Sequence, residues 1–235
     1  NFDVSGGTLK GTGSIGNLTG TGTGIIAPGN SPGLVTTTNL SLSSGNTLQI
    51  ELTGANSFPV AGTDYDQIVV SSSGTVNLGG ATLNLSASFT GNQGTVFTII
   101  DNQHLSALIQ GTFAGLSEGA VITANGRAYK ISYAGGTGND VTLSVLNSPT
   151  ITLLNPTSGK IGTSVIITGS DFINVSQVSF NGTAQTTYTV DSPTQITTTV
   201  PSGATTGTVS VTTVAGTISS TNSFTVDSTA PTLSI

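Results

Sequence analysis

The sequence predicts an all-β protein in two parts, a solenoid followed by a β-sandwich. Gly, Thr, Ser and Asn dominate its 235 residues, and only 6% of the residues are charged. Apolar residues recur in short alternating runs, which is the pattern of half-buried strands. Thr and Val favour a pleated surface, while Gly and Asn supply turns. The clearest runs are TLQIEL (47–52), ATLNLSAS (81–88) and TVSVTTV (208–214).

The composition argues against several classes of function. Without cysteine, the chain forms no disulfide, thiolate metal site or cysteine nucleophile. A net charge of −6 with four basic residues argues against a nucleic-acid partner, because neutralising phosphates needs Lys and Arg. No G-x-S-x-G elbow or other triad frame occurs, so we predict neither an enzyme nor a cofactor. No apolar run approaches the roughly 20 residues of a membrane helix, so we expect no transmembrane segment in this chain.

The chain begins at Asn1, without Met or a signal peptide. Extended β chains that are rich in Thr, Ser and Gly but poor in Lys are typical of exported bacterial surface proteins. We therefore expect an excised part of a longer protein that is extracellular or attached to the bacterial cell surface.

Residues 1–33 contain too few aliphatic side chains to close a globular core. They suit a solenoid, in which each turn of chain contributes a few inward aliphatics and its neighbours complete the core. The same pattern continues to residue 89, and GTVFTIIDN (94–102) and GRAYKISYAGG (126–136) are interpreted as further strands. HLSALIQ (104–110) has apolar residues at helical spacing and predicts one helical turn.

A change of pattern marks a boundary near residue 146. LNSPT (146–150) is interpreted as a linker, because Pro149 interrupts the strand pattern. Denser strands follow, and Asn181-Gly182 between two of them is a strong two-residue hairpin signal. Several short strands in so short a segment predict a β-sandwich. We therefore divide the chain into 1–146, a linker at 147–150, a sandwich at 151–226 and a final segment at 227–235.

The first part contains, in order, GGTLKGTGSIGNL…GIIAPGNSPG, YDQIVV, GTVFTIIDN, GTFAGLSEGA and YAGGTGNDVTLSV. These pieces resemble the C-terminal region of autotransporter-type passenger β-helices and related large bacterial surface proteins in their order and spacing. The resemblance covers about residues 1–146. It implies a right-handed parallel β-helix that ends in a capping β region.

The second part resembles another family. LNPTSGKIGTSVIITGSDF, VSFNGTAQTTYTV and SPTQITTTVPSGATTGTVSVTT are similar to an IPT/TIG immunoglobulin-like domain. The final segment, 227–235, resembles the first strand of a further bacterial Ig-like repeat, which implies that the partners include other domains of one long chain. In the Ig-like sandwich that the resemblance implies, the core residues would be Phe172, Val178, Phe180, Ile196, Val209, Val211 and Phe224.

GGTGND (135–140) looks like one copy of a calcium-binding nonapeptide. In a calcium loop, Asp140 and backbone carbonyls would supply the oxygen ligands. Such repeats act in tandem, however, and this chain has one copy, with Thr142 at the position of the large apolar residue. We therefore interpret the string as a glycine turn before the last strand of the β-helix, with calcium binding as the alternative.

Asp64 and Asp66 are the other calcium candidates. Carboxylates at i and i+2 of an extended segment lie on the same side and could hold a hard cation. In a loop, Asp64 would instead cap a turn, which is the interpretation we favour. We therefore assign no residue to a metal or to another cofactor.

These observations favour a non-catalytic structural or adhesive segment, a stalk or adhesin, of a large bacterial cell-surface or secreted protein. The first alternative is a self-assembling extracellular fibre subunit. Its assembly strand would be Thr232, Leu233, Ser234 and Ile235, which would add to a sheet edge of a neighbouring copy. The open solenoid end at Asn1 would be a second surface for self-association.

The second alternative is a glycan-binding module of a secreted enzyme. Its partner would be a glycan or protein of a host or of a surface. Because glycan sites usually present aromatic side chains, Tyr129 and Tyr133 are the contacts that this alternative would test.

Overall fold

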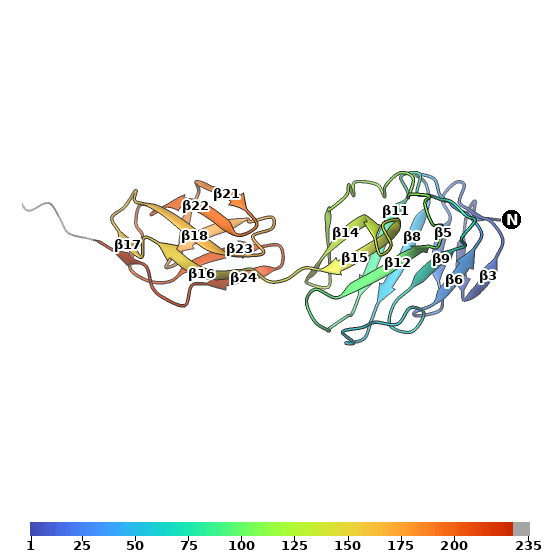
Figure 1. Ribbon diagram of the computed structural model, residues 1–235, viewed down its shortest axis with the longest axis horizontal. Helices are drawn as coiled ribbons and strands as arrows, with labels where there is room; N and C mark the ends of the chain where they lie inside the picture. The colour runs from blue at the N-terminus through green and yellow to red at the C-terminus, as the bar shows by residue number, and fades with distance from the viewer. Residues whose placement is uncertain (228–235) are drawn as a thin grey trace, which may run out of the picture. The chain divides into compact units, whose positions relative to one another are not determined.

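The structure, a computed structural model, describes residues 1–227, which form strands, turns and loops without a helix (Figure 1). The prediction of an all-β chain is therefore confirmed for these residues. The chain divides into two compact units, Asn1–Leu146 and Asn147–Ile235. Within the described part, no helix is long and apolar enough to cross a membrane.

The first unit contains strands β1 to β15. Up to β12 the strands come in four triplets, and each triplet contributes one strand to each of three sheets. The bounds are β1 (Phe2–Asp3), β2 (Thr8–Gly11), β3 (Gly13–Ile15), β4 (Leu18–Thr19), β5 (Ile25–Pro28), β6 (Leu34–Thr37), β7 (Leu40–Ser41), β8 (Thr47–Leu52), β9 (Gln67–Val70), β10 (Val76–Asn77), β11 (Thr82–Ala87), β12 (Val96–Asn102), β13 (Val121–Ala124), β14 (Arg127–Gly135) and β15 (Asp140–Val145).

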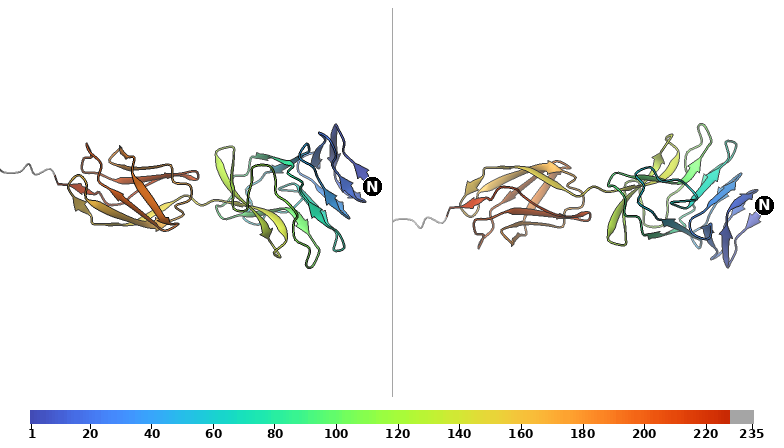
Figure 2. Two further views of the ribbon diagram at one scale, coloured as in Figure 1. Left: turned by 90° about the horizontal axis from the view of Figure 1, so that it is seen from above. Right: turned by 90° about the horizontal axis from the view of Figure 1, so that it is seen from below.

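Each strand of a triplet pairs in parallel with the corresponding strand of the next triplet. Sheet A has the order β1-β4-β7-β10, sheet B has β2-β5-β8-β11, and sheet C contains β3-β6-β9-β12. Neighbours in a sheet are therefore three strands apart in the sequence, and Figure 2 shows the strands of the first unit side by side. Parallel pairing needs a crossover connection, which the other two strands of each triplet provide.

The register stacks apolar side chains in rows inside the first unit. In sheet A, Leu18 pairs with Leu40, and Leu40 pairs with Val76. In sheet C, Val35 pairs with Ile68. All five side chains are buried, and burying one contributes roughly 1.5–3 kcal/mol. A stretch with few aliphatic residues thus obtains its core from the triplets on either side.

Polar side chains also link successive triplets. Asn17 Nδ2 donates to Asn1 Oδ1 at 2.9 Å, and Asn39 Nδ2 donates to Asn17 Oδ1 at 2.7 Å. Asn39 Oδ1 in turn accepts from the backbone N–H and the hydroxyl of Thr75. Because these residues directly precede the strands of sheet A, the bonds run along one edge of that sheet. We call Asn1, Asn17 and Asn39 the asparagine stack.

The last strands of the first unit pair in the opposite sense. β15 is antiparallel to β12, β14 to β15, and β13 to β14. Asn125 and Gly126 form the turn between β13 and β14, with φ angles of 48° and 74°. Ile122 and Ala124 of this hairpin pack against the hydrophobic core, so the hairpin covers part of it.

The predicted helical turn at 104–110 is wrong. The segment is a loop, in which Nδ1 of His104 accepts hydrogen bonds from the backbone N–H groups of Ser106 and Ala107. The carbonyls of His104 and Ala107 accept hydrogen bonds from Asn139 Nδ2. Side chains therefore satisfy the backbone groups that a helix would have paired with one another.

The second unit consists of two four-stranded sheets around one core. One sheet has the order β16-β18-β22-β21 and the other has β20-β19-β23-β24, while β17 pairs in parallel with β25. The bounds are β16 (Thr150–Asn155), β17 (Ser158–Gly159), β18 (Ser164–Ser170), β19 (Gln177–Phe180), β20 (Thr183–Gln185), β21 (Tyr188–Ser192), β22 (Gln195–Thr199), β23 (Val209–Thr213), β24 (Gly216–Ser219) and β25 (Thr225–Val226).

The predicted core of the second unit is confirmed. Asn181-Gly182 also forms the predicted hairpin between β19 and β20, with φ angles of 44° and 82°. The rings of Phe180 and Phe224 meet edge to face, 5.3 Å apart between centroids. Seven core residues are at most 2% exposed, namely Phe172, Val178, Phe180, Ile196, Val209, Val211 and Phe224.

Candidate functional site

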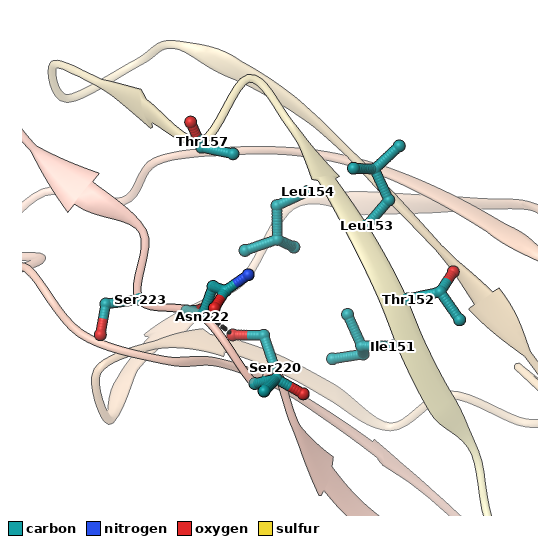
Figure 3. Close-up of a pocket in the computed structure, with 9 residues that line it drawn as sticks. Ile151, Thr152, Leu153, Leu154, Thr157, Ser220, Asn222 and Ser223 are labelled. Carbon is teal, nitrogen blue, oxygen red and sulfur yellow. Dashed lines mark hydrogen bonds between the residues drawn. The ribbon is translucent and has the colours of Figure 1, made fainter.

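A groove on the second unit is the candidate functional site (Figure 3). Residues 151–154 of β16 form one wall, and residues 220–223, which follow β24, form the other. Thr157, next to the start of β17, also lines the groove. The volume of the groove, including its opening to solvent, is about 390 Å³.

The groove exists because each sheet of the second unit has an edge at this place. Among the described residues, β16 has only β18 as a neighbour in its sheet, and β24 has only β23. A bulge between Ile151 and Leu153 shifts the register of β16. The shift places Leu154 on the inner face with Ile151, where it is 6% exposed, and turns Leu153 outward, where it is 55% exposed. An edge strand with an exposed apolar side chain is a surface for strand addition.

The opposite wall of the groove is polar but carries no charge. Ser220 Oγ donates to the carbonyl of Asn222 at 2.7 Å and accepts from the N–H of Val209 at 3.0 Å. Both bonds fix the turn after β24, so the hydroxyl is held in place by the backbone. The groove can therefore hold an uncharged, partly apolar segment.

A second, smaller hollow lies beside sheet B of the first unit, lined in part by Lys10, Gln49, Glu51 and Asp66. Asp66 is 2% exposed. Its Oδ1 accepts from the N–H of Gly33 at 2.7 Å, and its Oδ2 accepts from the N–H of Glu51 at 2.8 Å. Burial raises the pKa of Asp66 to about 6, although the two backbone donors act in the opposite direction.

Asp64, one of the predicted calcium candidates, organises a loop. Its two carboxylate oxygens accept from Asn56 Nδ2 at 3.1 and 3.0 Å, and Oδ2 also accepts from the N–H of Val60 at 2.8 Å. The bond from Asn56, followed by that from Val60, lowers the pKa of Asp64. Asp64 and Asp66 therefore hydrogen-bond to separate donors on different segments, although they are only two residues apart.

Asp140, the third calcium candidate, is buried at the start of β15. Its Oδ1 accepts from the N–H of Asn102 at 2.8 Å, and its Oδ2 accepts from the N–H of Thr137 at 3.1 Å. Gly136 has a φ of 53°, and a Cβ atom there would collide with the Asp140 carboxylate. These features are those of a glycine turn. Across residues 1–227, no group of three or more His, Cys, Asp or Glu side chains gathers that could hold a metal ion.

The assembly strand that the sequence predicts at 232–235 lies outside the described residues. The last described strand, β25, nevertheless runs beside the groove. It pairs with β17, which begins one residue after Thr157 of the groove lining. The N–H of Asp227 donates to the carbonyl of Gly159 at 3.0 Å, which extends this pairing by one residue.

The aromatic contacts named for glycan binding do not form an exposed platform. Tyr129 is fully buried in the core, so its assignment as a glycan contact is wrong. Tyr133 is half-buried, its ring lies 6.2 Å from that of Phe113, and its Oη accepts from the N–H of Phe113 and donates to the carbonyl of Leu116. Both tyrosines therefore contribute to the packing of the β13–β15 region.

Comparison with known proteins identifies the second unit. Residues 149–226 match the IPT/TIG domain family, so this part of the chain is an IPT/TIG domain with the Ig-like sandwich that the resemblance implied. No curated protein sequence matches the chain.

Two solved structures are similar to parts of the chain. One is a crystal structure of domains "CD" of a protein, with 32% identity and a TM-score of 0.31, covering 33% of this chain and 32% of that one. The other is a crystal structure "with xylogluco-oligosaccharide", with 27% identity and a TM-score of 0.33, covering 49% of this chain and 25% of that one. The chain thus spans about a third and a quarter of those two chains. TM-scores this low do not establish a common fold.

The sequence predicted the glycine turn at Asp140 but missed the groove. The sequence predicts one apolar strand that contains Ile151, Leu153 and Leu154. Alternation alone would place Leu153 on the same face as Ile151. The bulge breaks that alternation, and a bulge has no marker in these residue types. The two adjacent leucines indicate only that one of them would be exposed, because successive side chains of a strand point to opposite faces.

Proposed function

We propose that this chain is a non-catalytic structural segment, a stalk, of a large bacterial cell-surface or secreted protein. In this proposal residues 1–146 are a parallel β-helix with a capping β region, followed directly by the IPT/TIG domain. The observation that carries it is the parallel pairing of each strand from β1 to β9 with the strand three places further along the chain. Such pairing lets a chain gain length by adding similar turns, each held by its neighbours.

The side chains that join the triplets support a load-bearing role. The asparagine stack runs through three triplets and ends on Thr75, which precedes the fourth. Each bond joins residues at least 16 positions apart in sequence, so separating the triplets breaks side-chain and backbone bonds together. The absence of cysteine and the few charged residues suit a chain that has to cross membranes unfolded, which supports an extracellular location.

The test is a replacement in the parent protein on its own cell surface. Deleting residues 1–226 is expected to reduce the reach of the domains outside them, and a length-matched pair of unrelated β-domains should restore it. Surface display of each variant, measured with an antibody to a retained domain, is the control. If the length-matched replacement fails to restore the reach of those domains, the chain has a role besides its length, and the stalk proposal is wrong.

A second candidate function is self-assembly into a fibre, and the groove of the IPT/TIG domain favours it. Its β16 edge and the exposed Leu153 would accept 232–235 of a neighbouring copy as an added strand. The first triplet offers another surface, because β1, β2 and β3 each have a sheet neighbour on one side among the described residues.

Light scattering of the purified chain over a range of concentrations tests this assembly. Self-association is expected in the full chain and should be lost after removal of 227–235 and in Leu153→Lys. Lys130→Ala, an exposed change in the first unit, is the control and should associate like the unchanged chain. If the unchanged chain stays monomeric at high concentration, assembly through the groove is wrong.

A further inference from the structure

The loop between β8 and β9 presents an aromatic ring to solvent. Phe58 is 90% exposed, and Val60, two residues further on, is 57% exposed. Two exposed apolar side chains so close together form a small apolar tip, and a ligand that covered them would remove apolar surface from water, which is favourable. No charged side chain occurs in the stretch 53–60.

The backbone of this loop is fixed by hydrogen bonds. Asp64 binds Asn56 and the N–H of Val60 through its carboxylate, and its carbonyl accepts from the N–H and the hydroxyl of Thr53. The N–H of Asp64 donates back to the carbonyl of Val60 at 2.7 Å. Phe58 therefore projects from a segment that is tied at both ends, which lowers the entropy lost when a ligand binds.

The neighbouring loop, between β11 and β12, lies beside this tip and adds polar groups. The N–H of Thr90 donates to the carbonyl of Gly54 at 2.9 Å, and Asn92 Nδ2 donates to Ser57 Oγ at 2.7 Å. Asn56, Ser57, Thr90 and Asn92 are all exposed. We call these four residues together with Phe58 the Phe58 ledge.

The loop after β12 also exposes apolar side chains, but they are aliphatic. Leu105 is 99% exposed and Leu108 is 68% exposed, on the loop held by His104 and Asn139. Neither side chain offers an aromatic face. Leu105 is therefore a matched control, because it is an exposed apolar side chain on another fixed loop of the same unit.

We propose that the Phe58 ledge is a binding site for a neutral glycan. The electron-rich face of an aromatic ring attracts the C–H groups on the flat face of a pyranose, and short amide and hydroxyl side chains around it suit the hydroxyl rim of the sugar. One ring is far smaller than the roughly 800 Å² per partner that a stable protein interface buries. A sugar of one or two units fits its size better than a protein. The stretches 53–60 and 88–95 carry no cation that would attract an acidic sugar, and the Asp64 carboxylate bonded to Asn56 would repel one, so a neutral sugar is favoured.

This site is distinct from the groove of the IPT/TIG domain and does not depend on the stalk proposal. The stalk proposal can hold whether or not the Phe58 ledge binds a glycan. The tyrosines of the β13–β15 region play no part in it.

The experiment is an NMR titration of the full chain with cellohexaose, whose equatorial substituents leave flat C–H faces. Saturable shifts are expected for the amides of 54–60 and 90–92. Phe58→Ala should raise the dissociation constant by about tenfold or more, whereas Leu105→Ala should bind like the unchanged chain. Because Phe58 is almost fully exposed, its replacement should leave the thermal midpoint unchanged, which separates lost contact from lost fold.

Three outcomes would overturn the proposal. The first is the absence of saturable binding of cellohexaose to the unchanged chain. The second is equal binding by Phe58→Ala, and the third is equal loss of binding in Leu105→Ala. Polygalacturonate serves as the acidic comparison, and tighter binding of it than of cellohexaose would refute the choice of a neutral ligand.

Discussion

The side-chain amide of Asn39 donates a 2.7 Å hydrogen bond to Oδ1 of Asn17, 22 residues earlier in the chain. Each residue directly precedes a strand of sheet A, and the strands that follow are paired in parallel. The side-chain hydrogen bonds of the asparagine stack therefore follow the same register as the backbone pairing of sheet A. A slip of one residue between the triplets would break this bond and turn the buried leucines outward.

Replacing Asn39 with alanine should destabilise the first unit. Thr75 would lose the acceptor of two hydrogen bonds and Asn17 would lose a donor, for a cost of about 1–2 kcal/mol. Hydrogen–deuterium exchange of the full chain, measured on peptides of β4, β7 and β10, reports the loss. Asn84→Ala, at an exposed site on β11, is the control and should change exchange little. Equal effects of the two changes would contradict a specific role for the stack.

Tyr129 and Tyr133 give opposite predictions. Tyr129 Oη is buried without a hydrogen-bond partner among the described residues, whereas Tyr133 Oη accepts one bond and donates another. Tyr129→Phe should therefore leave the free energy of unfolding unchanged or raise it by up to about 1 kcal/mol, while Tyr133→Phe should lower it by about 1 kcal/mol. Urea denaturation of the two variants measures the difference. A clear loss of stability in Tyr129→Phe would show that its hydroxyl has a partner in solution.

The strands could be predicted from the sequence better than the loops and sites. Leu48, Ile50 and Leu52 alternate with polar residues, and the structure buries all three, because period-two alternation directly reports a sheet with one buried face. The helical turn predicted at 104–110 was wrong because contacts distant in sequence determine this segment. Its helical spacing is real, but long-range bonds from Asn139, 35 residues away, fix the segment as a loop.

The candidate sites depend on contacts that the sequence does not display. Tyr129 lies on the same face of β14 as the buried Ile131, so its alternation already indicated burial. Asp64 and Asp66 look alike in sequence, yet one fixes a surface loop and the other is buried between β8 and the turn at Gly33. Partners so distant in the chain cannot be assigned from residue spacing.

Calcium should not change the stability of the chain. Both oxygens of the Asp140 carboxylate already accept backbone N–H groups, from Asn102 and Thr137. The thermal midpoint is therefore expected to be the same in excess calcium and in excess chelator. A large stabilisation by calcium would contradict the glycine-turn interpretation of 135–140.

The neighbouring Asn139 should matter for stability instead. Its Nδ2 donates to the carbonyls of Asn102, His104 and Ala107, and it is buried. Asn139→Ala would leave these carbonyls without that donor and should cost about 1–3 kcal/mol. Urea denaturation measures this loss of stability. Hydrogen–deuterium exchange should show faster amide exchange in 102–108. Unchanged exchange in this loop would refute the assignment of Asn139 as its anchor.

Asp66 should make stability fall as the pH rises. Burial raises its pKa to about 6 in the folded chain, above the ordinary value of 3.8. The folded state therefore binds the proton more tightly, so the stabilisation is complete below pH 3.8 and is lost as the pH rises through about 6. Because solvent reaches the hollow beside Asp66, we expect a loss of roughly 1–2 kcal/mol.

Asp66→Asn is the variant that isolates this effect, because an amide does not titrate. Its free energy of unfolding, measured from about pH 4 to about pH 8, should lack the fall assigned to Asp66. Asp3→Asn, which changes an exposed carboxylate bonded to Thr21, should keep it. The same fall in Asp66→Asn as in the unchanged chain would assign it to another group.

Asp64 should have the opposite dependence on pH, confined to its loop. Its pKa is lowered by the hydrogen bonds from Asn56 and Val60, so the stabilisation is present above the ordinary value of 3.8 and is lost as the pH falls through the lower, folded value. Protonation weakens the carboxyl group as the acceptor that holds Asn56 and Val60, so the loop that carries Phe58 becomes less ordered. Amide exchange at Val60 should accelerate in acid, and Asp64→Asn should show similar acceleration at neutral pH. If exchange at Val60 in Asp64→Asn matched that of the unchanged chain, the carboxylate would not be what orders the Phe58 ledge, and a rigid glycan site there would lose its physical basis.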